Sequence, residues 1–350
     1  MSDPIKLTQF SHGAGCGCKI APQVLDEILK SNFAQPDHKN LLVGNHSKDD
    51  GAVYDLGNGQ ALISTTDFFM PIVDDPFDFG RIASANAISD VYAMGGKPIL
   101  AIAVLGWPVD KIPADVARLV IEGGRSICAE AGIPLAGGHS IDTIEPMFGL
   151  AVNGLVSIPH LKQNNTAQPG DVLFLTKRLG VGILSTAQKR NLLLPDHLKI
   201  MVQQMTTLNK VGEALGKISG VHAMTDVTGF GLMGHLIEMA EGSDTTAYLH
   251  YDKLLFAEGV KDYLAQQCIP GGTVRNWASY GHKAQFSSNI NHAEAINTLP
   301  DPQTNGGLLI SVAPHAVDDV INVFNSFGLL DFITPIGIMG QQEEKAVVVE

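Results

Sequence analysis

The sequence predicts two mixed α+β domains preceded by a mobile, glycine-rich N-terminal loop. The chain has 350 residues, and at about 150 residues per domain two domains are expected. Hydrophobic residues make up 45% of the chain, which is ample for two globular cores. Strand-like and helix-like runs alternate without a regular strand–helix–strand rhythm. This irregularity favours an α+β fold over a doubly wound parallel sheet.

The N-terminal loop is expected to cover residues 1–20. The segment from 11 to 19 has three glycines among nine residues, too many for a regular helix or strand. A first helix is predicted to begin at Pro22, because the apolar residues between 24 and 29 recur at helical spacing.

The first domain is expected to span residues 21–158. Two long helices are predicted, one at about 77–94 that is closed by two glycines, and one at about 113–131. Short apolar runs predict strands at 41–43, 52–56, 61–65, 98–105, 133–136 and 149–156.

The second domain is expected to span residues 159–350. Its first twelve residues are polar and rich in turn formers, which places the boundary there. Helices are predicted at 202–215 and at about 232–240, the latter after a glycine-rich turn. Strands are predicted at 172–176 and 308–312, with one or two more over 336–349.

Charge and composition exclude several classes of function. A formal net charge of −13 argues against a nucleic-acid surface, which requires a field of Lys and Arg. The N-terminus lacks the pattern of a signal peptide, and the longest apolar run is too short to span a bilayer. Four cysteines in a chain of this length do not form a disulfide scaffold. A cytoplasmic protein that contacts no membrane is therefore expected.

Aspartates at the ends of predicted strands suggest a metal site. Asp50 precedes one strand, and Asp67 and Asp226 follow two others, so these carboxylates are expected to gather at one rim of a sheet. Asp90 lies within an apolar helix, four residues after Asn86 and on the same face. Oxygen ligands without a histidine cluster favour Mg²⁺ over Zn²⁺. The alternative is that these aspartates cap turns and Asp90 forms a buried ion pair.

Two glycine-rich segments are candidates for phosphate binding. The segment 136–140 follows a short predicted strand, and the segment 226–234 leads into a helix, so both can present backbone N–H groups. The second segment also matches the dinucleotide-binding pattern, with Asp252 at a suitable distance. Polar residues in the preceding strand and the acidic Asp226 count against that interpretation.

Cys16 is the leading candidate for a reactive residue. Lys19 and the loop N–H groups are expected to lower its thiol pKa, and exposure would permit attack. Lys19 can also contact a phosphate. The alternatives are an inert cysteine, or a zinc site that combines Cys16 and Cys18 with His12.

Six stretches of the chain resemble the selenophosphate synthetase family, and together they run through essentially its whole length. Three of them also resemble aminoimidazole ribonucleotide synthetase and thiamine-monophosphate kinase, whereas the C-x-C-K loop carries the specific resemblance. Asn305 departs from the pattern, because serine is expected there. The stretches are 11–19 (SHGAGCGCK), 64–69 (STTDFF), 86–96 (NAISDVYAMGG), 136–140 (AGGHS), 225–231 (TDVTGFG) and 301–307 (DPQTNGG).

The resemblance implies an enzyme that converts ATP, selenide and water to selenophosphate, AMP and phosphate. It implies a homodimer whose N-terminal domains meet and bind ATP and Mg²⁺. Cys16 and Lys19 would be catalytic, and Asp50, Asp90 and Asp226 would hold Mg²⁺. The residues implied in ATP binding are Lys19, Ser47, Lys48, Asp49, Asp67, Asp90, Gly138, His139 and Ser140.

Several alternatives stay open at this point. A related synthetase or kinase would consume ATP with another acceptor. A non-catalytic nucleotide- or metal-binding protein would pass a chalcogen to a partner, and a dehydrogenase would bind NAD(H). K⁺ is a candidate cofactor and a selenium-delivery protein a candidate partner.

Overall fold

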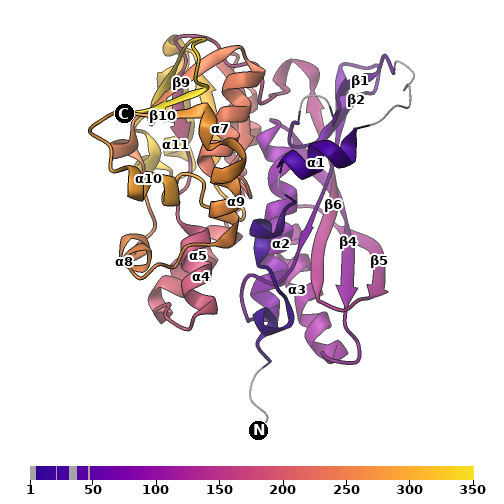
Figure 1. The fold of residues 1–350 in the computed structure, drawn as a ribbon. Coiled ribbons are helices and arrows are strands. Elements are labelled where there is room, and N and C mark those ends of the chain that lie inside the picture. Colours follow the sequence, from indigo (N-terminus) through magenta and orange to yellow (C-terminus); the bar gives the residue numbers. More distant parts are fainter. Residues whose placement is uncertain (1–4, 21, 31–37, 46–47) are drawn as a thin grey trace.

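The computed structural model describes residues 5–20, 22–30, 38–45 and 48–350. It contains two α+β units that lie side by side (Figure 1). Each unit is built on its own sheet, one from residues 41–157 and the other from residues 172–349. The predicted α+β class with two mixed domains is confirmed. The segment 159–170, where the boundary is expected, lies between the last strand of the first sheet and the first strand of the second.

The N-terminal sheet has six strands, and α2 (Pro76–Ala93) and α3 (Ala114–Ala131) cover one of its faces (Figure 1). All neighbouring strands are antiparallel except β4 and β5, which are parallel. A short helix, α1 (Pro22–Leu29), precedes the sheet. In spatial order the strands are β1 (Leu41–Val43), β2 (Ala52–Asp55), β3 (Gln60–Phe69), β6 (Met147–Ser157), β4 (Lys97–Trp107) and β5 (Leu135–Asp142).

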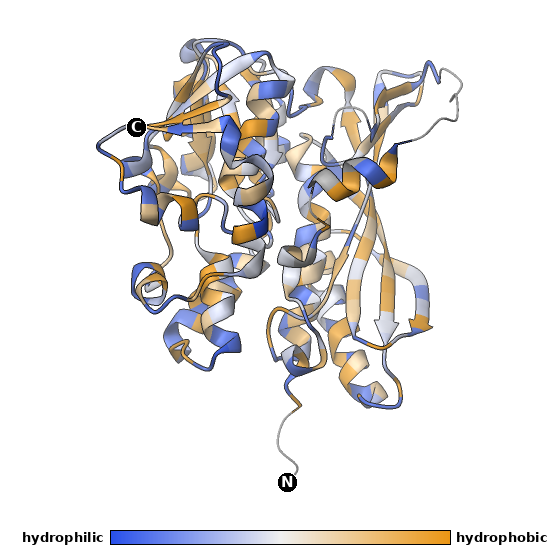
Figure 2. Ribbon diagram, in the orientation of Figure 1, coloured by the Kyte–Doolittle hydropathy of each residue, from blue (hydrophilic) through white to orange (hydrophobic). Residues whose placement is uncertain are grey.

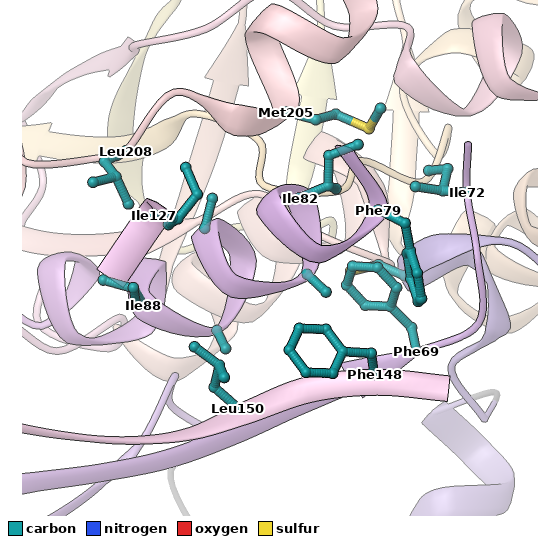
Figure 3. Close-up of a cluster of buried hydrophobic side chains, with 14 of the residues drawn as sticks. Phe69, Ile72, Phe79, Ile82, Ile88, Ile127, Phe148, Leu150, Met205 and Leu208 are labelled. Carbon is teal, nitrogen blue, oxygen red and sulfur yellow. The ribbon is translucent and has the colours of Figure 1, made fainter. Parts of the chain in front are cut away.

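Helix α2 is the common core of both units. Its side chains pack on β3 and β6 on one side and on α5 of the second unit on the other. Phe79 packs between Phe69 and Phe148 in a tilted and an edge-to-face contact, with ring centroids 6.2 and 6.3 Å apart. Met205, from the second unit, joins the same buried cluster (Figure 3). Because this apolar packing is continuous across the boundary, the two units are held in a fixed relation.

The C-terminal unit combines a seven-stranded sheet with the α-helices named below. Its strands, in spatial order, are β10 (Ala284–Phe286), β13 (Val347–Val349), β9 (Thr245–Leu249), β12 (Gly337–Gln341), β7 (Val172–Leu175), β11 (Leu308–Val312) and β8 (Val221–Asp226). The helices are α4 (Val181–Lys189), α5 (Pro195–Thr206), α6 (Val211–Gly216), α7 (Gly231–Gly242), α8 (Val260–Ala265), α9 (Gly271–Tyr280), α10 (His292–Thr298) and α11 (Val317–Ser326).

The predicted helix over 202–215 is wrong, because the chain forms α5 and α6 with a break between them. Asn209 in the break donates from Nδ2 to Ser89 Oγ at 2.8 Å and to the Gly306 carbonyl at 2.9 Å. These tertiary bonds hold the amide of Asn209 inside the molecule, and local helix propensity does not report them.

In the described part of the chain, the two long helices α2 and α3 both lie on one face of the N-terminal sheet and leave the opposite face uncovered by either (Figure 1). Hydrophobic residues nevertheless continue along its strands (Figure 2). Phe68, Ile102 and Ile141 point from this face and are 50%, 41% and 54% exposed. Among the described residues, no helix is both long and apolar enough to cross a membrane.

Candidate active site

Most of the predicted site residues come together in a cavity of about 680 Å³ between the two units. The turn before β2 contributes Asp50, strand β3 contributes Asp67, and α2 contributes Asp90. Asp226 enters from the end of β8, and Lys19 from the N-terminal segment. The expectation of a single sheet rim is wrong: the carboxylates come from both sheets, a helix and a turn, and the packing of α2 against both units brings them together.

Two of these carboxyl groups, those of Asp50 and Asp226, have a buried oxygen that no donor among the described residues satisfies. Thr225 Oγ1 donates to Asp50 Oδ1 at 2.9 Å, and Thr65 Oγ1 donates to Asp90 Oδ2. Within the described part of the chain, the second oxygen of Asp50 and the Oδ2 atom of Asp226 have no hydrogen-bond partner. A buried carboxylate in this condition is costly unless a cation reaches it.

The pKa values of the buried aspartates are raised. Burial is the main cause for Asp50 and Asp90, whose pKa values lie well above the ordinary range, and neighbouring carboxylates add to it. Burial also raises the pKa of Asp226, partly offset by Ser89, His235 and Lys19. Since like charges repel, a cation that binds beside these carboxyl groups would favour their ionised forms.

The cluster fits Mg²⁺ chemically, although it is not a complete cage. The donors are carboxylate oxygens, which Mg²⁺ prefers, and two of them are the unpartnered atoms described above. Over residues 5–20, 22–30, 38–45 and 48–350, no three His, Cys, Asp or Glu side chains are placed to bind one ion. Mg²⁺ commonly takes one or two carboxylates and completes its shell with water and substrate phosphates.

The Cys16 thiol lies inside the site rather than at its surface. Cys16 belongs to a 3₁₀ turn, Gly15–Cys18, and is only 2% exposed. Its Sγ donates to Asn86 Oδ1 at 3.2 Å, and its backbone N–H donates to Thr304 Oγ1 at 3.1 Å. Burial raises the pKa of the Cys16 thiol, and Lys19 offsets only part of this effect. The expectation of an exposed thiol with a lowered pKa is therefore wrong in this conformation.

Asn86 connects three parts of the site. Its Oδ1 accepts from Cys16 Sγ and also from the backbone N–H of Asn305, at 2.7 Å. Its Nδ2 donates to Asp67 Oδ2 at 2.5 Å. The four-residue spacing between Asn86 and Asp90 predicted that both side chains lie on one face of the helix. The partners of Asn86 come from segments far away in the sequence, and that spacing does not indicate them.

Lys19 faces the acidic cluster. Its Nζ donates to Thr228 Oγ1 at 3.5 Å and lies 4.0 Å from Asp67 Oδ1. Burial disfavours the ammonium form, but the Asp67 carboxylate, with smaller effects of Cys16 and Asp90, outweighs it and raises the pKa of Lys19. Lys19 is thus a charged ammonium at neutral pH and can contact a phosphate.

The segment before β2 contributes further residues to the cavity. Lys48 and Asp49 both line it. The side chain of Asn164 donates to the Lys48 carbonyl at 3.0 Å, and burial raises the pKa of Asp49 to about 7. Ser47, which is also expected to bind ATP, lies outside the described residues.

Gly138, His139 and Ser140 lie elsewhere, on the exposed edge strand β5. The prediction of a phosphate-binding turn at 136–140 is wrong, because these residues are part of a strand. A Cβ at position 138 would lie 2.2 Å from the Ala103 carbonyl oxygen, so this glycine permits the close approach of β4 and β5. None of the three residues lines the cavity of its own chain.

The dinucleotide-binding alternative is excluded by topology. A strand and a helix do flank the glycine-rich segment, as β8 and α7. However, β8 is an edge strand antiparallel to β11, and β9, the next strand in sequence, lies four places away. A dinucleotide fold requires the two strands of one parallel unit. The zinc alternative has no support in the described residues, where Cys16 contacts Asn86 instead.

The sequence analysis missed several residues of the cavity. Thr65 could have been found, because it lies two residues before Asp67 in one strand and therefore shares its face. Thr228 and His235 contact each other at 3.3 Å beside the cluster. Thr228 lies in the turn before α7 and His235 within that helix, so no simple spacing rule marks their contact.

Two family models match the chain. AIR synthase related protein, N-terminal domain, matches residues 48–156, and AIR synthase related protein, C-terminal domain, matches residues 168–350. Among curated relatives, the selenide, water dikinase of Photorhabdus laumondii is 55% identical, and the alignment covers 100% of this chain and 99% of that protein. The selenide, water dikinase of Pseudomonas putida is 56% identical, and both chains are covered completely.

Solved structures share the fold at low sequence identity. Thiamine-monophosphate kinase from Stenotrophomonas maltophilia superposes with a TM-score of 0.65 at 19% identity, covering 95% of this chain and 96% of that one. Hydrogenase maturation protein HypE in complex with ATP superposes with a TM-score of 0.63 at 17% identity, covering 96% and 88%. At these identities the likeness establishes the two-unit architecture alone.

Proposed function

The chain belongs to the selenide, water dikinase family of AIR synthase-related proteins, and we propose that the cavity between its two units is where ATP is bound and split. Its activity is that of the family: ATP, selenide and water give selenophosphate, AMP and phosphate. One observation carries the location of the site. Asp50, Asp67, Asp90, Asp226 and Lys19 meet in one cavity although they come from distant segments, and Cys16 is hydrogen-bonded beside it to Asn86.

The reaction uses both phosphoanhydride bonds of ATP. In the first step an electron pair of hydroselenide forms a P–Se bond with the γ-phosphorus, the bond to the β-phosphate oxygen breaks toward ADP, and the selenium proton is released. Water then attacks the retained ADP, which gives AMP and phosphate. Such transfers depend chiefly on positioning and charge neutralisation.

The aspartates would serve as the metal-binding side of the cavity. Asp50, Asp90 and Asp226 would hold Mg²⁺, which neutralises phosphate charge when bound. Asp67 is held by Asn86 and Lys19 at the inner end of the cavity and would fix the orientation of the metal-bound phosphates. Lys48 and Asp49 line the cavity from the turn before β2, beside which we place the nucleotide.

Lys19 and Cys16 would act at the phosphoryl group that is transferred. Lys19 carries its charge at neutral pH and would contact a phosphate oxygen as a point charge. Cys16 is held as a thiol by Asn86, so it is suited to donate a proton or a hydrogen bond near the reacting atoms. We propose that the segment 11–19 closes over the cavity during the first step and keeps water away from it.

A homodimer would bring Gly138, His139 and Ser140 to a nucleotide. Strand register places Phe68, Gly149, Val104 and His139 in one row, on the face of the N-terminal sheet opposite α2 and α3. His139 is three strands from β3, about 14 Å at ordinary strand spacing, and so is remote from the cavity of its own chain. The exposed apolar residues of this face would be covered by a second copy, and its His139 would then reach the first copy's site.

Phosphorus-31 NMR tests the proposed function. The protein with Mg²⁺, ATP and anaerobic selenide should give a phosphorus signal with selenium satellites, together with equal amounts of AMP and phosphate. A sample without selenide is the control. ADP without that signal would move the activity to another acceptor. The same assay with and without K⁺, or with a selenium-delivery protein in place of free selenide, tests those two proposals.

A further inference from the structure

A second, smaller cavity adjoins the first. Its volume is about 160 Å³, and two of its wall residues, Lys19 and Asp67, also line the large cavity. Cys16 lines the small cavity but not the large one. The two spaces therefore share Lys19 and Asp67 as a common wall, and Cys16 distinguishes the small one.

The size of the small cavity limits what it can hold. A water molecule takes up about 30 Å³, so the space suits a ligand of one or two heavy atoms with its hydration. Nucleotide-sized ligands require pockets of about 300 Å³ or more. The large cavity meets that requirement and the small one does not.

The remaining walls are apolar and soft. Phe68, Phe69, Met70 and Met147 line the cavity together with Gly15 and Cys16, so most of its wall residues are apolar or contain sulfur. These groups are polarisable and weak hydrogen-bond partners. They offer little to a water molecule or a phosphate oxygen, both of which need several strong partners. A large, polarisable anion loses less solvation free energy than a phosphate when it enters such a space.

Charge at the shared wall favours a monoanion. The ammonium of Lys19 has three N–H donors, and Thr228 and Asp67 occupy two directions around it. The Asp67 carboxylate is itself engaged, since Asn86 Nδ2 donates to its Oδ2 at 2.5 Å. A singly charged ligand beside Lys19 therefore meets a cation while the nearest carboxylate is already paired.

We infer that this small cavity is the acceptor site, in which selenide binds non-covalently as the hydroselenide monoanion before it attacks ATP. The inference rests on the proposed function and adds to it where the acceptor lies. Hydroselenide at the Lys19 end of the small cavity would face a γ-phosphate in the large one, with the leaving ADP on the far side. Cys16 and Met147 then select a soft anion over water.

A matched pair of substitutions tests this assignment. Met147→Glu and Met147→Gln differ by a charge and hardly in volume, and Met147 is half-buried in the wall of the small cavity. A carboxylate there should raise the KM for selenide on the order of tenfold or more by repulsion, with the KM for ATP unchanged. Met147→Gln should have a much smaller effect. Sedimentation of both variants should match the wild type.

The other outcomes are informative as well. If Met147→Glu raises the KM for ATP as much as that for selenide, the small cavity belongs to the nucleotide and the inference is overturned. Equal behaviour of the two variants overturns it too. A wild-type enzyme that forms no AMP in response to selenide would instead defeat the proposed function itself. Met70→Glu and Met70→Gln form a second pair if the first variants fail to fold.

Anomalous diffraction gives a measurement that requires no substitution. Crystals of the wild-type protein soaked anaerobically with sodium hydroselenide should show a selenium peak bounded by Cys16, Lys19 and Met147. Non-covalent binding predicts a peak separated from Sγ by more than an S–Se bond length. A peak bonded to Sγ, a peak only in the large cavity, or none at concentrations that saturate turnover contradicts the assignment.

Discussion

The Cys16 thiol donates to Asn86 and is shielded from solvent, so its reactivity depends on that one acceptor. A serine hydroxyl can make the same hydrogen bond, which separates the chemistry of sulfur from the structure of the turn. Cys16→Ser is therefore expected to keep its thermal stability and its affinity for ATP while selenide-dependent AMP formation falls about a hundredfold or more.

Cys128→Ser is the matched control, since Cys128 is also a buried thiol but lies in α3, away from the cavity. Activity, nucleotide binding by calorimetry and melting temperature are measured on both variants. Wild-type turnover in Cys16→Ser would remove the catalytic role of the thiol. Loss of ATP binding would show that Cys16 acts through the fold of the segment instead.

Asn86 has three polar partners in the site, namely Cys16, Asp67 and Asn305. Replacing it with leucine, which is similar in size, leaves Asp67 Oδ2 and the Asn305 N–H without their present partner. Each buried group left unsatisfied costs about 1–3 kcal/mol, so Asn86→Leu should lower the free energy of unfolding by about 2–5 kcal/mol. Urea denaturation measures it, with Asn325→Leu on the exposed side of α11 as the control. A loss within error of that control would contradict the network.

At the scale of elements, the loop 301–307 joins the two units. Gln303 Oε1 accepts from the N–H groups of Gly180 and Val181, and Asp301 Oδ2 accepts from Gly182 N–H at 3.1 Å, so this loop satisfies the start of α4. Asn305 of the same loop contacts Asn86 in α2. Strain in the loop would therefore reach both α4 and the site.

Asp301 makes stability depend on pH in this element. Burial raises its pKa from 3.8 to about 8, so the folded protein binds a proton that the unfolded chain has released. Stability is fully present below about pH 4 and falls as pH rises toward 8, by at most about 1.4 kcal/mol per pH unit from this group. Asp301→Asn should remove that slope.

Chemical denaturation of the wild type and Asp301→Asn at several pH values between 4 and 9 measures this contribution. Asp318→Asn, at an exposed position of α11, is the control for loss of one carboxyl group. The variant should gain stability relative to the wild type as pH rises. A difference that stays constant with pH would show that Asp301 is ionised in the folded protein.

The bounds of a helix or strand can be predicted from the sequence where local residues determine them, and not where tertiary contacts do. Helices α2 and α3 lie within one residue of their predicted bounds, because each is a long run free of internal helix breakers that ends at a clear glycine signal. Strand β11 has its predicted bounds of 308 and 312. The strand β5 extends through two glycines that suggest a turn, because pairing with β4 overrides local preference.

The same limit applies to the site. Motifs identified Cys16, Lys19 and the aspartates one by one, since each stands out in its own segment. The burial of Cys16 comes from packing against Thr304 and Asn86, which are 288 and 70 residues away in the sequence. The pKa of a thiol depends on such contacts more than on the charge of its neighbours in sequence.

At the scale of the whole molecule, the position of His139 leads to a prediction about subunits. It lies three strands from β3 on a face with exposed apolar residues, so a shared site requires one copy to supply Asp226 and the other to supply His139. Asp226→Asn and His139→Ala homodimers should each be nearly inactive. In a mixed dimer, one of the two sites has both wild-type residues.

Refolding the two inactive variants together at equal amounts should therefore restore roughly a quarter of the wild-type activity, because about half of the dimers are mixed and each has one intact site. Ile102→Asp, which places a charge on the same face, should give monomers in sedimentation and should prevent the recovery when present in both chains. Recovery with Ile102→Asp present, or none without it, would place His139 outside a shared site. Recovery that depends on the intact face would show that each nucleotide cavity is completed by the neighbouring chain.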